Sequence, residues 1–241
     1  MQDCDVLAFG AHPDDVELMA GGTIIKLVKL GYRVTMVSLT AGETGTRGTP
    51  EIRNQEFTDS AEIMGLTDWQ MLDIPDGFVN SDRPHRLKVI EVLRRYRPRV
   101  VFAPYWKTRH PDHGNCSILV REASFLAGLK KIDTGQPAHR PAKIIYYCEH
   151  YPFQPSFIVD VTDTFDQRLQ AIRAYKSQVF NAEMVSPDEN KTYISSPEYF
   201  QSLTSRAQFW GHRIGVKYGE PFLVREPLGV QDPIALFYSL A

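Results

Sequence analysis

Residues 4–15 read CDVLAFGAHPDD, an apolar run followed at once by a histidine, a proline and two aspartates. Residues 4–10 have the nearly continuous apolar pattern of a strand that is buried on both faces of a parallel sheet. We expect a helix over residues 18–30, ended by Gly31, and a β-branched strand over residues 33–39. The chain therefore begins with a strand–helix–strand unit, and the polar residues occupy the turn after its first strand.

The alternation of strands and helices continues along the chain. A helix is predicted at Pro50–Met64, with Thr49 as N-cap and Gly65 ending it. The further predicted elements are strands near 69–73, 100–104, 143–148 and 156–161, and helices over 85–96, 112–127, 163–180 and, after a polar loop at 186–197, to about 217. Such alternation with short joints predicts an α/β fold, Rossmann-like and doubly wound, with a mostly parallel sheet and helices on both faces. We expect one domain over residues 1–241.

Composition limits the classes of function. The 241 residues are 43% hydrophobic and 23% charged with a net charge of -2, so no basic excess exists to bind nucleic acid. Cys4, Cys116 and Cys148 are odd in number and lack C-x-x-C spacing, which fits a reducing cytoplasm. No apolar run approaches the length of a membrane span, and acidic residues stand where a signal peptide carries basic ones. These features predict a cytoplasmic protein that binds neither nucleic acid nor membrane.

The turn after the first strand does not fit a dinucleotide. A dinucleotide-binding turn reads G-x-G-x-x-G, because its glycines let the backbone approach a pyrophosphate. Here residues 10–17 read GAHPDDVE, with two carboxylates where phosphates would dock. Carboxylates repel an anion and attract a cation, so the turn favours a metal ion over a nucleotide.

Two short clusters carry the chemistry: HPDD at residues 12–15 and HPDH at residues 110–113. They follow the first and fourth strands, which are neighbours at the switch point of a sheet with strand order 3-2-1-4, so we expect them to meet there. Neutral imidazoles and a carboxylate are the ligands of catalytic zinc. The motifs alone leave open which residues bind the metal. One aspartate can be a ligand while the other acts as general base, and one of the two histidines His110 and His113 can be a ligand while the other acts as an acid outside the ligand set. Capping of the following helices is the structural alternative.

The motifs GAHPDDVELMAGGTI (10–24) and HPDHGN (110–115) resemble the LmbE/PIG-L family of zinc-dependent N-acetylglucosaminyl deacetylases. TAGETGTRGTPEIR (40–53), PYWKTRHPDH (104–113) and ISSPEYF (194–200) resemble its bacillithiol-biosynthesis branch in particular. The resemblance implies that the protein forms a homo-oligomer, for which a hexamer is one option. It also implies one zinc ion per chain, although iron(II) and cobalt suit the same ligands.

The resemblance also assigns roles to single residues. It implies His12, Asp15 and His113 as metal ligands and Asp14 as general base. His110 would be the charged group facing the oxyanion, with Asp112 behind it.

The substrate implied by that branch is N-acetylglucosaminyl-malate, with another N-acetylglucosamine (GlcNAc) substrate such as diacetylchitobiose as the alternative. A non-catalytic, metal-stabilised sugar-binding protein is the alternative from another class. Arg53 and Arg109 would contact the conjugate, since an arginine fork suits malate's carboxylate. Thr108 stands where the mycothiol branch has a helper tyrosine, so we expect Tyr199, or else Tyr193, to take that place.

Overall fold

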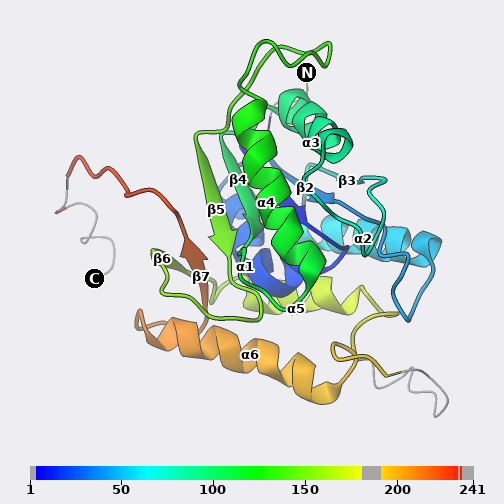
Figure 1. Ribbon diagram of the computed structural model, residues 1–241. Helices are drawn as coiled ribbons and strands as arrows, with labels where there is room; N and C mark the ends of the chain where they lie inside the picture. Colours follow the sequence, from blue (N-terminus) through cyan, green and yellow to red (C-terminus); the bar gives the residue numbers. More distant parts are fainter. Residues whose placement is uncertain (1–3, 181–190, 233, 235–241) are drawn as a thin grey trace.

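One seven-stranded sheet organises the protein in the computed structural model, which describes residues 4–180, 191–232 and 234 (Figure 1). The strand order is β3-β2-β1-β4-β5-β7-β6. β7 runs antiparallel to its neighbours β5 and β6, and the other pairings are parallel. The strands are β1 (Val6–Gly10), β2 (Val34–Ser38), β3 (Asp68–Met71), β4 (Val100–Pro104), β5 (Lys143–Tyr147), β6 (Phe157–Asp160) and β7 (Gly219–Leu223). The predicted order 3-2-1-4 is confirmed.

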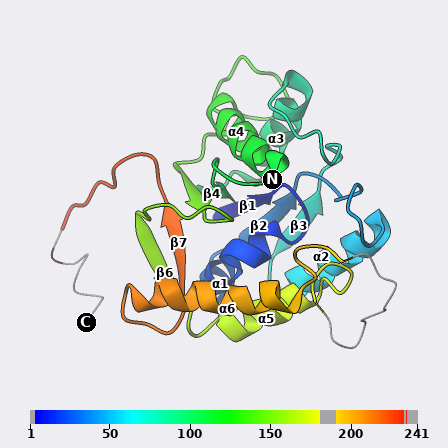
Figure 2. The same cartoon turned by 60° about the horizontal axis from the view of Figure 1, so that its bottom comes forward.

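Helices cover both faces of the sheet, as Figure 2 shows. α3 and α4 lie on one face, and α1, α2, α5 and α6 lie on the other. The helices are α1 (Asp15–Lys29), α2 (Pro50–Met64), α3 (Arg83–Tyr96), α4 (Pro111–Leu126), α5 (Phe165–Arg173) and α6 (Pro197–His212). Among the helices of the described chain, none combines the length and the apolar character needed to cross a bilayer.

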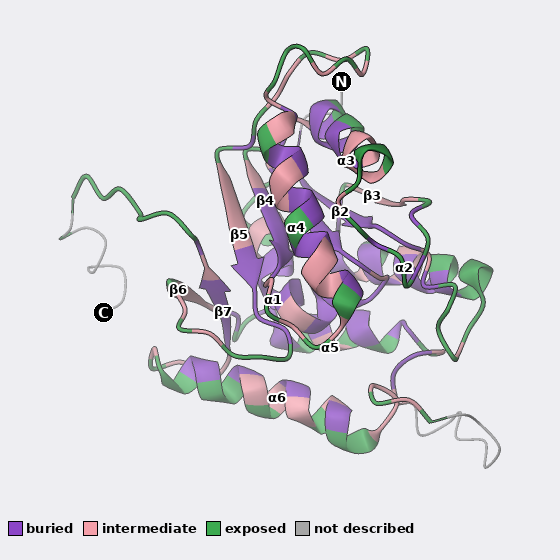
Figure 3. Cartoon of the chain, viewed as in Figure 1, coloured by how far each residue is buried: buried purple, intermediate pink, exposed green. Residues whose placement is uncertain are grey.

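β1 is buried on both of its faces, which explains its apolar sequence. Val6 and Ala8 point into the core beneath α1 and α2, whereas Leu7 and Phe9 point into the core beneath α3 and α4. All five β1 residues are buried, and the buried colour runs through the centre of the sheet in Figure 3. β1 pairs with β2 on one side and β4 on the other, so the turns that follow β1 and β4 lie side by side.

The caps predicted for the second helix are confirmed. Thr49 accepts a hydrogen bond from Ile52 N at the N-terminus of α2, and Pro50 occupies the first turn. Gly65 follows the helix with φ of 73°, a left-handed conformation that glycine adopts without strain.

The C-terminal third departs from the predicted elements. The helix expected over residues 163–180 ends at Arg173, where Ala174 N and Tyr175 N bond to the i−3 carbonyls of Ala171 and Ile172, and further on Ser177 N donates to Glu56 Oε1 of α2. The last helix ends at His212, a few residues before the expected end near 217, and β7 follows at Gly219–Leu223. β7 was not predicted from the sequence, and it contains Pro221 although prolines are rare in a strand flanked on both sides. Residues 186–190 of the predicted loop lie outside the described residues.

Candidate active site

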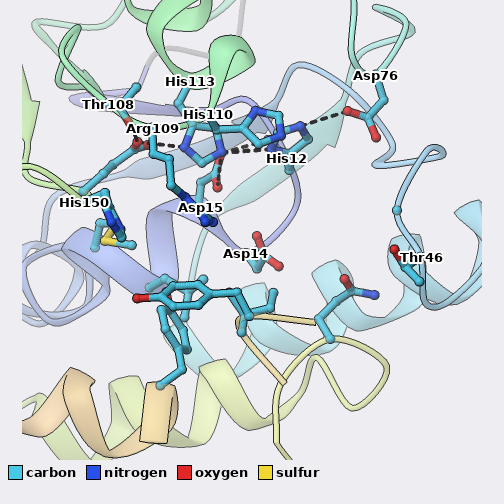
Figure 4. A pocket seen from close by; sticks show the side chains of 18 of the residues that line it. His12, Asp14, Asp15, Thr46, Asp76, Thr108, Arg109, His110, His113 and His150 are labelled. Atoms are coloured by element: carbon cyan, nitrogen blue, oxygen red, sulfur yellow. Dashed lines mark hydrogen bonds and ion pairs between the residues drawn. The ribbon is translucent and has the colours of Figure 1, made fainter. Parts of the chain in front are cut away.

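The two predicted clusters meet in a cavity of about 300 Å³ at the carboxyl ends of the parallel strands (Figure 4). His12 follows β1, and His110 and His113 follow β4. Two further acidic residues join them: Asp76 from the loop after β3 and Glu149 just after β5. The convergence arises from the sheet order, because the carboxyl ends of parallel strands share one edge.

His12, Asp15 and His113 form a triangle of donor atoms. His12 Nδ1 lies 3.1 Å from His113 Nε2, which lies 3.2 Å from Asp15 Oδ1. The third edge, 3.7 Å, runs from His12 Nδ1 to the other oxygen of the same carboxylate, Asp15 Oδ2. Ligand atoms about 2.0–2.2 Å from a tetrahedral ion are roughly 3.4 Å apart, so the triangle has the size of one face of such a site.

Hydrogen bonds at the far side of each ring fix the tautomers of the two histidines. His12 Nε2 lies 2.9 Å from Asp76 Oδ1, and His113 Nδ1 lies 2.7 Å from Glu149 Oε2. A ring nitrogen that faces a carboxylate carries the proton, which leaves the opposite nitrogen as a lone pair. When both rings are neutral and these bonds are kept, His12 Nδ1 and His113 Nε2 face each other as lone pairs. Carboxylate–histidine pairs of this kind orient metal ligands, so the residues present fit a divalent cation.

The charges around the histidines favour a positive ion. Burial disfavours a protonated His12, but the hydrogen-bonding carboxylates of Asp112 and Asp76 outweigh it and raise its pKa to about 10. Burial likewise opposes a charged Asp15, yet His113 and His12 hold its pKa below the ordinary value. The metal-free site attracts a proton strongly, and a divalent cation bound to the same lone pairs would compete with that proton.

Asp14 is held beside this triangle without serving as a helix cap. It occupies the N-cap position of α1 with φ of 110°, a left-handed conformation that costs energy outside glycine, and its side chain makes no capping hydrogen bond. Asp15 Oδ2 instead accepts from Ala11 N and His12 N. The capping alternative therefore does not explain either aspartate.

Arg53 shapes the environment of Asp14. Its Nη2 donates to Pro13 O at 2.6 Å and lies 3.4 Å from Asp14 Oδ2. Burial raises the pKa of Asp14 to about 7, although the charge of Arg53 opposes the rise. A carboxylate with a pKa near the working pH is suited to accept and return a proton.

His110 lies next to His113 but differs from it in its hydrogen bonds. The two rings stack with centroids 4.8 Å apart. His110 Nδ1 accepts from Asp112 N at the start of α4, so the proton of the neutral ring is on Nε2. Burial and the charges of His12 and His113 lower the pKa of His110. In the metal-free protein His110 is therefore a neutral donor, where we expected a charged one.

Asp112 lies next to His110 in the first turn of α4, and its carboxylate contacts the loop after β3. Its Oδ2 accepts from Gly77 N at 2.7 Å and lies 3.6 Å from His12 Nε2. The carboxylate turns to His12 because the loop after β3 supplies the backbone donor.

The residues expected to contact substrate all line the cavity, but they differ in their exposure and in their contacts. Arg53 is only 5% exposed and is held by Pro13 O and Asp14, so it is less available to a ligand than we expected. Arg109 is exposed at the opening, with its guanidinium carbon 4.8 Å from the centre of the Tyr193 ring. Tyr199 is buried, and its ring lies 5.0 Å from that of the exposed Tyr193.

Asp76 and Glu149 are the site residues that sequence reasoning missed. Each lies within a few residues of the carboxyl end of a parallel strand, β3 for Asp76 and β5 for Glu149. Thr44 N and Oγ1 also donate to Asp76, and Thr108 Oγ1 donates to Glu149. The sequence signal that could have found them is an acidic residue shortly after a predicted parallel strand. The carboxyl ends of parallel strands lie at one edge of the sheet, so such residues come close to the site.

Comparisons with known proteins identify a family of similar sequences. Residues 7–124 match the sequence model of the PIG-L family, described as GlcNAc-PI de-N-acetylase. The "Diacetylchitobiose deacetylase" of Thermococcus kodakarensis is 33% identical over 189 residues, 72% of this chain and 69% of that protein. The "Probable N-acetyl-alpha-D-glucosaminyl L-malate deacetylase 2" of Bacillus cereus is 28% identical over 86% of this chain and 97% of that protein.

A solved structure extends the similarity over almost the whole fold. The conserved protein TT1542 from Thermus thermophilus is 36% identical, with a TM-score of 0.85 over 95% of this chain and 98% of that chain. The similarity therefore includes the C-terminal strands and α6, beyond the residues that match the family model.

Proposed function

Because this chain belongs to the PIG-L (LmbE) family of de-N-acetylases, we propose that it hydrolyses the acetamide bond of an N-acetylglucosamine conjugate. The products would be acetate and the free amine. The observation that carries the proposal is the placement of Asp14, a buried carboxylate beside the donor triangle that takes no part in it. A binding protein would need the triangle but not a strained second aspartate.

His12, Asp15 and His113 would hold the metal ion. When bound, a divalent ion in such a site polarises a carbonyl oxygen and makes water more acidic. The donor set suits zinc, and iron(II) or cobalt would suit it as well.

Asp14 would move the proton. Its carboxylate takes a proton from the water that attacks the acetyl carbonyl, and it returns that proton to the nitrogen as the C–N bond breaks. Arg53 keeps the carboxylate oriented through its contacts to Pro13 O and Asp14 Oδ2. The left-handed backbone at Asp14 directs the side chain away from the capping position, which leaves it available for this task.

His110 would stabilise the negative charge that develops on the carbonyl oxygen. Its Nε2–H is available because Nδ1 is occupied by Asp112 N. A donor that is held in place before the reaction costs no reorganisation as the charge develops. Tyr199 is the second candidate donor, since its buried ring lines the same cavity.

For the group attached to the sugar, we propose a neutral saccharide such as the second residue of diacetylchitobiose. Two observations support it: the 33% identical relative is named for that substrate, and Arg53, which we had assigned to the malate carboxylate, is buried and held by Asp14 and Pro13 O. N-acetylglucosaminyl-malate is the competing substrate, and Arg109 at the cavity opening is the residue that would bind its carboxylate.

The test is release of free amine from diacetylchitobiose, N-acetylglucosaminyl-malate and a simple N-acetylglucosamine glycoside. Purified protein is first stripped of metal and then reloaded with zinc, and the same preparation is assayed for bound metal. We expect amine and acetate in equal amounts, with diacetylchitobiose preferred. A zinc-loaded protein that releases amine from none of the three would refute the proposal. A preference for the malate conjugate would reassign the attached group.

A further inference from the structure

Most residues that line the cavity are polar or charged, and only a few have aliphatic or thioether side chains. Of its lining residues in the described chain, the aliphatic or thioether side chains are Leu18, Met19 and Ile194. Leu18 belongs to the hydrophobic core together with Tyr199, and Met19 and Ile194 pack against that core. An apolar wall in a polar cavity is a place for an apolar part of the ligand.

Helix geometry puts this wall next to the catalytic carboxylates. Leu18 follows Asp14 by four residues and Asp15 by three, and Met19 follows Asp15 by four. Residues at these spacings lie on the same side of a helix, one turn apart. The backbone has this register, since Leu18 N donates to Asp14 O at 2.9 Å in the first turn of α1.

The position of Met19 is fixed by Arg206 of α6. Arg206 Nη2 lies 3.1 Å from Met19 Sδ and donates to Glu149 O at 2.8 Å. Glu149 in turn holds His113. The thioether is therefore linked to the residues that hold the metal-binding histidine, and it cannot move away without disturbing these contacts.

An N-acetylglucosamine conjugate carries hydroxyl groups around its sugar ring and one methyl group, on the carbonyl carbon that water attacks. That methyl group must lie close to Asp14 when the carbonyl is in position to react. Resting on the proposed function, we propose that Leu18 and Met19 form an acyl-binding wall that accepts the acetyl methyl, and that Met19 limits the acyl chain to two carbons.

The physical basis is packing. Burying the methyl group against Leu18 and Met19 removes apolar surface from water. A longer acyl chain must displace the Met19 thioether, which is packed on one side and held by a guanidinium on the other. One methylene too many in an apolar pocket discriminates by roughly 10–200-fold.

The test uses one sugar glycoside with three N-acyl groups: acetyl, propionyl and butyryl. For the zinc-loaded protein we expect kcat/KM to fall about 10-fold or more with each added methylene. In Met19→Ala the butyryl-to-acetyl ratio of kcat/KM should rise by about 10-fold or more, because the shortened side chain leaves room for the added carbons. Met19→Leu, of similar volume, should keep the wild-type ratio.

Ile194→Ala is the matched control, because it removes a similar apolar side chain that lines the cavity from the segment before α6, not from α1, and it should leave the ratio unchanged. Circular dichroism and zinc content establish that each variant is folded and loaded. Equal wild-type rates on all three acyl groups would overturn the inference, as would a Met19→Ala ratio equal to wild type. Loss of activity on every substrate, the acetyl one included, would instead count against the proposed function.

Discussion

His12 Nδ1 and His113 Nε2 lie 3.1 Å apart although 101 positions separate them in the chain. They meet because β1 and β4 are parallel neighbours, so the turns after both strands lie at the same edge of the sheet. Both nitrogens are lone pairs once Asp76 and Glu149 hold the protons on the opposite side of each ring. Two facing lone pairs repel each other unless a proton or a cation lies between them.

Removing a donor of the triangle should remove the metal. We expect His12→Ala, Asp15→Ala and His113→Ala each to lose most of the bound zinc, because the set of three protein ligands that a catalytic site needs would be broken. Metal analysis of the purified variants checks this. Thr46→Ala, which changes another residue of the cavity lining, serves as control. A variant that keeps one zinc per chain would remove its residue from the ligand set.

The carboxylates behind the histidines should tune affinity without being ligands. We expect Asp76→Asn and Glu149→Gln to weaken zinc binding by roughly 10–100-fold, since each removes the partner that orients an imidazole. Competition with a chelator measures the change. Asp73→Asn is the control: Asp73 is in the same loop as Asp76, but its side chain is 87% exposed and pairs with Lys88. Unchanged affinity in both variants would show that the histidines need no such partners.

Asp14→Asn should separate catalysis from metal binding. The substitution keeps the size of the side chain but removes its basicity, so kcat should fall by about 10²–10⁴-fold while zinc stays bound. Zinc content and kcat are measured on one preparation. Near wild-type activity would exclude Asp14 as the base, and loss of zinc would make it a ligand.

The two arginines should respond differently to the charge of the substrate. Arg53→Ala should lower kcat on neutral and acidic conjugates alike, because Arg53 orients Asp14 and its backbone. Arg109→Ala should raise KM for an acidic conjugate only. The exposed guanidinium of Arg109 pairs with the substrate only when the substrate carries a carboxylate, so its removal does not affect neutral conjugates. Steady-state kinetics on diacetylchitobiose and N-acetylglucosaminyl-malate test both. A selective effect of Arg53→Ala on the malate conjugate would restore our original assignment of Arg53.

Glu17 should make the stability of the metal-free protein depend on pH. It is 1% exposed, and burial raises its pKa to about 7 despite hydrogen bonds from Tyr175 and Ser60. An unfolded chain binds this proton with a pKa of about 4.3. The folded state therefore holds more protons between these values, so the contribution of Glu17 is complete below about pH 4 and is lost as the pH rises through 7.

Glu17→Gln should remove that loss. The difference in free energy of unfolding between Glu17→Gln and wild type should shift in favour of the variant from pH 5 to pH 8, by about 3 kcal/mol at most. Denaturant melts in the presence of a chelator measure it. Glu91→Gln, on an exposed position of α3, should follow the wild-type slope. Parallel curves for wild type and Glu17→Gln would show that Glu17 does not titrate in this range.

Local sequence was sufficient for much of the fold. The apolar run of β1 predicts a strand buried on both faces, and Thr49, Pro50 and Gly65 mark both ends of α2 because capping depends only on adjacent residues. The HPDD and HPDH motifs likewise contain the candidate metal donors, since donor types can be read without coordinates. Once the strand order is assumed, their convergence follows as well.

The remaining features depend on contacts between distant segments. The segment after α5 contacts Glu56 of α2 through Ser177 N, and β7 joins the sheet between β5 and β6 although it contains Pro221. Arg53 was expected at the substrate, but packing against the turn after β1 makes it a neighbour of Asp14. The sequence by itself determined where the first four strands lie and which motifs follow the first and fourth of them. Only the tertiary structure decided which carboxylate faces which histidine, because hydrogen-bond partners from separate loops are set by where the sheet brings those loops together.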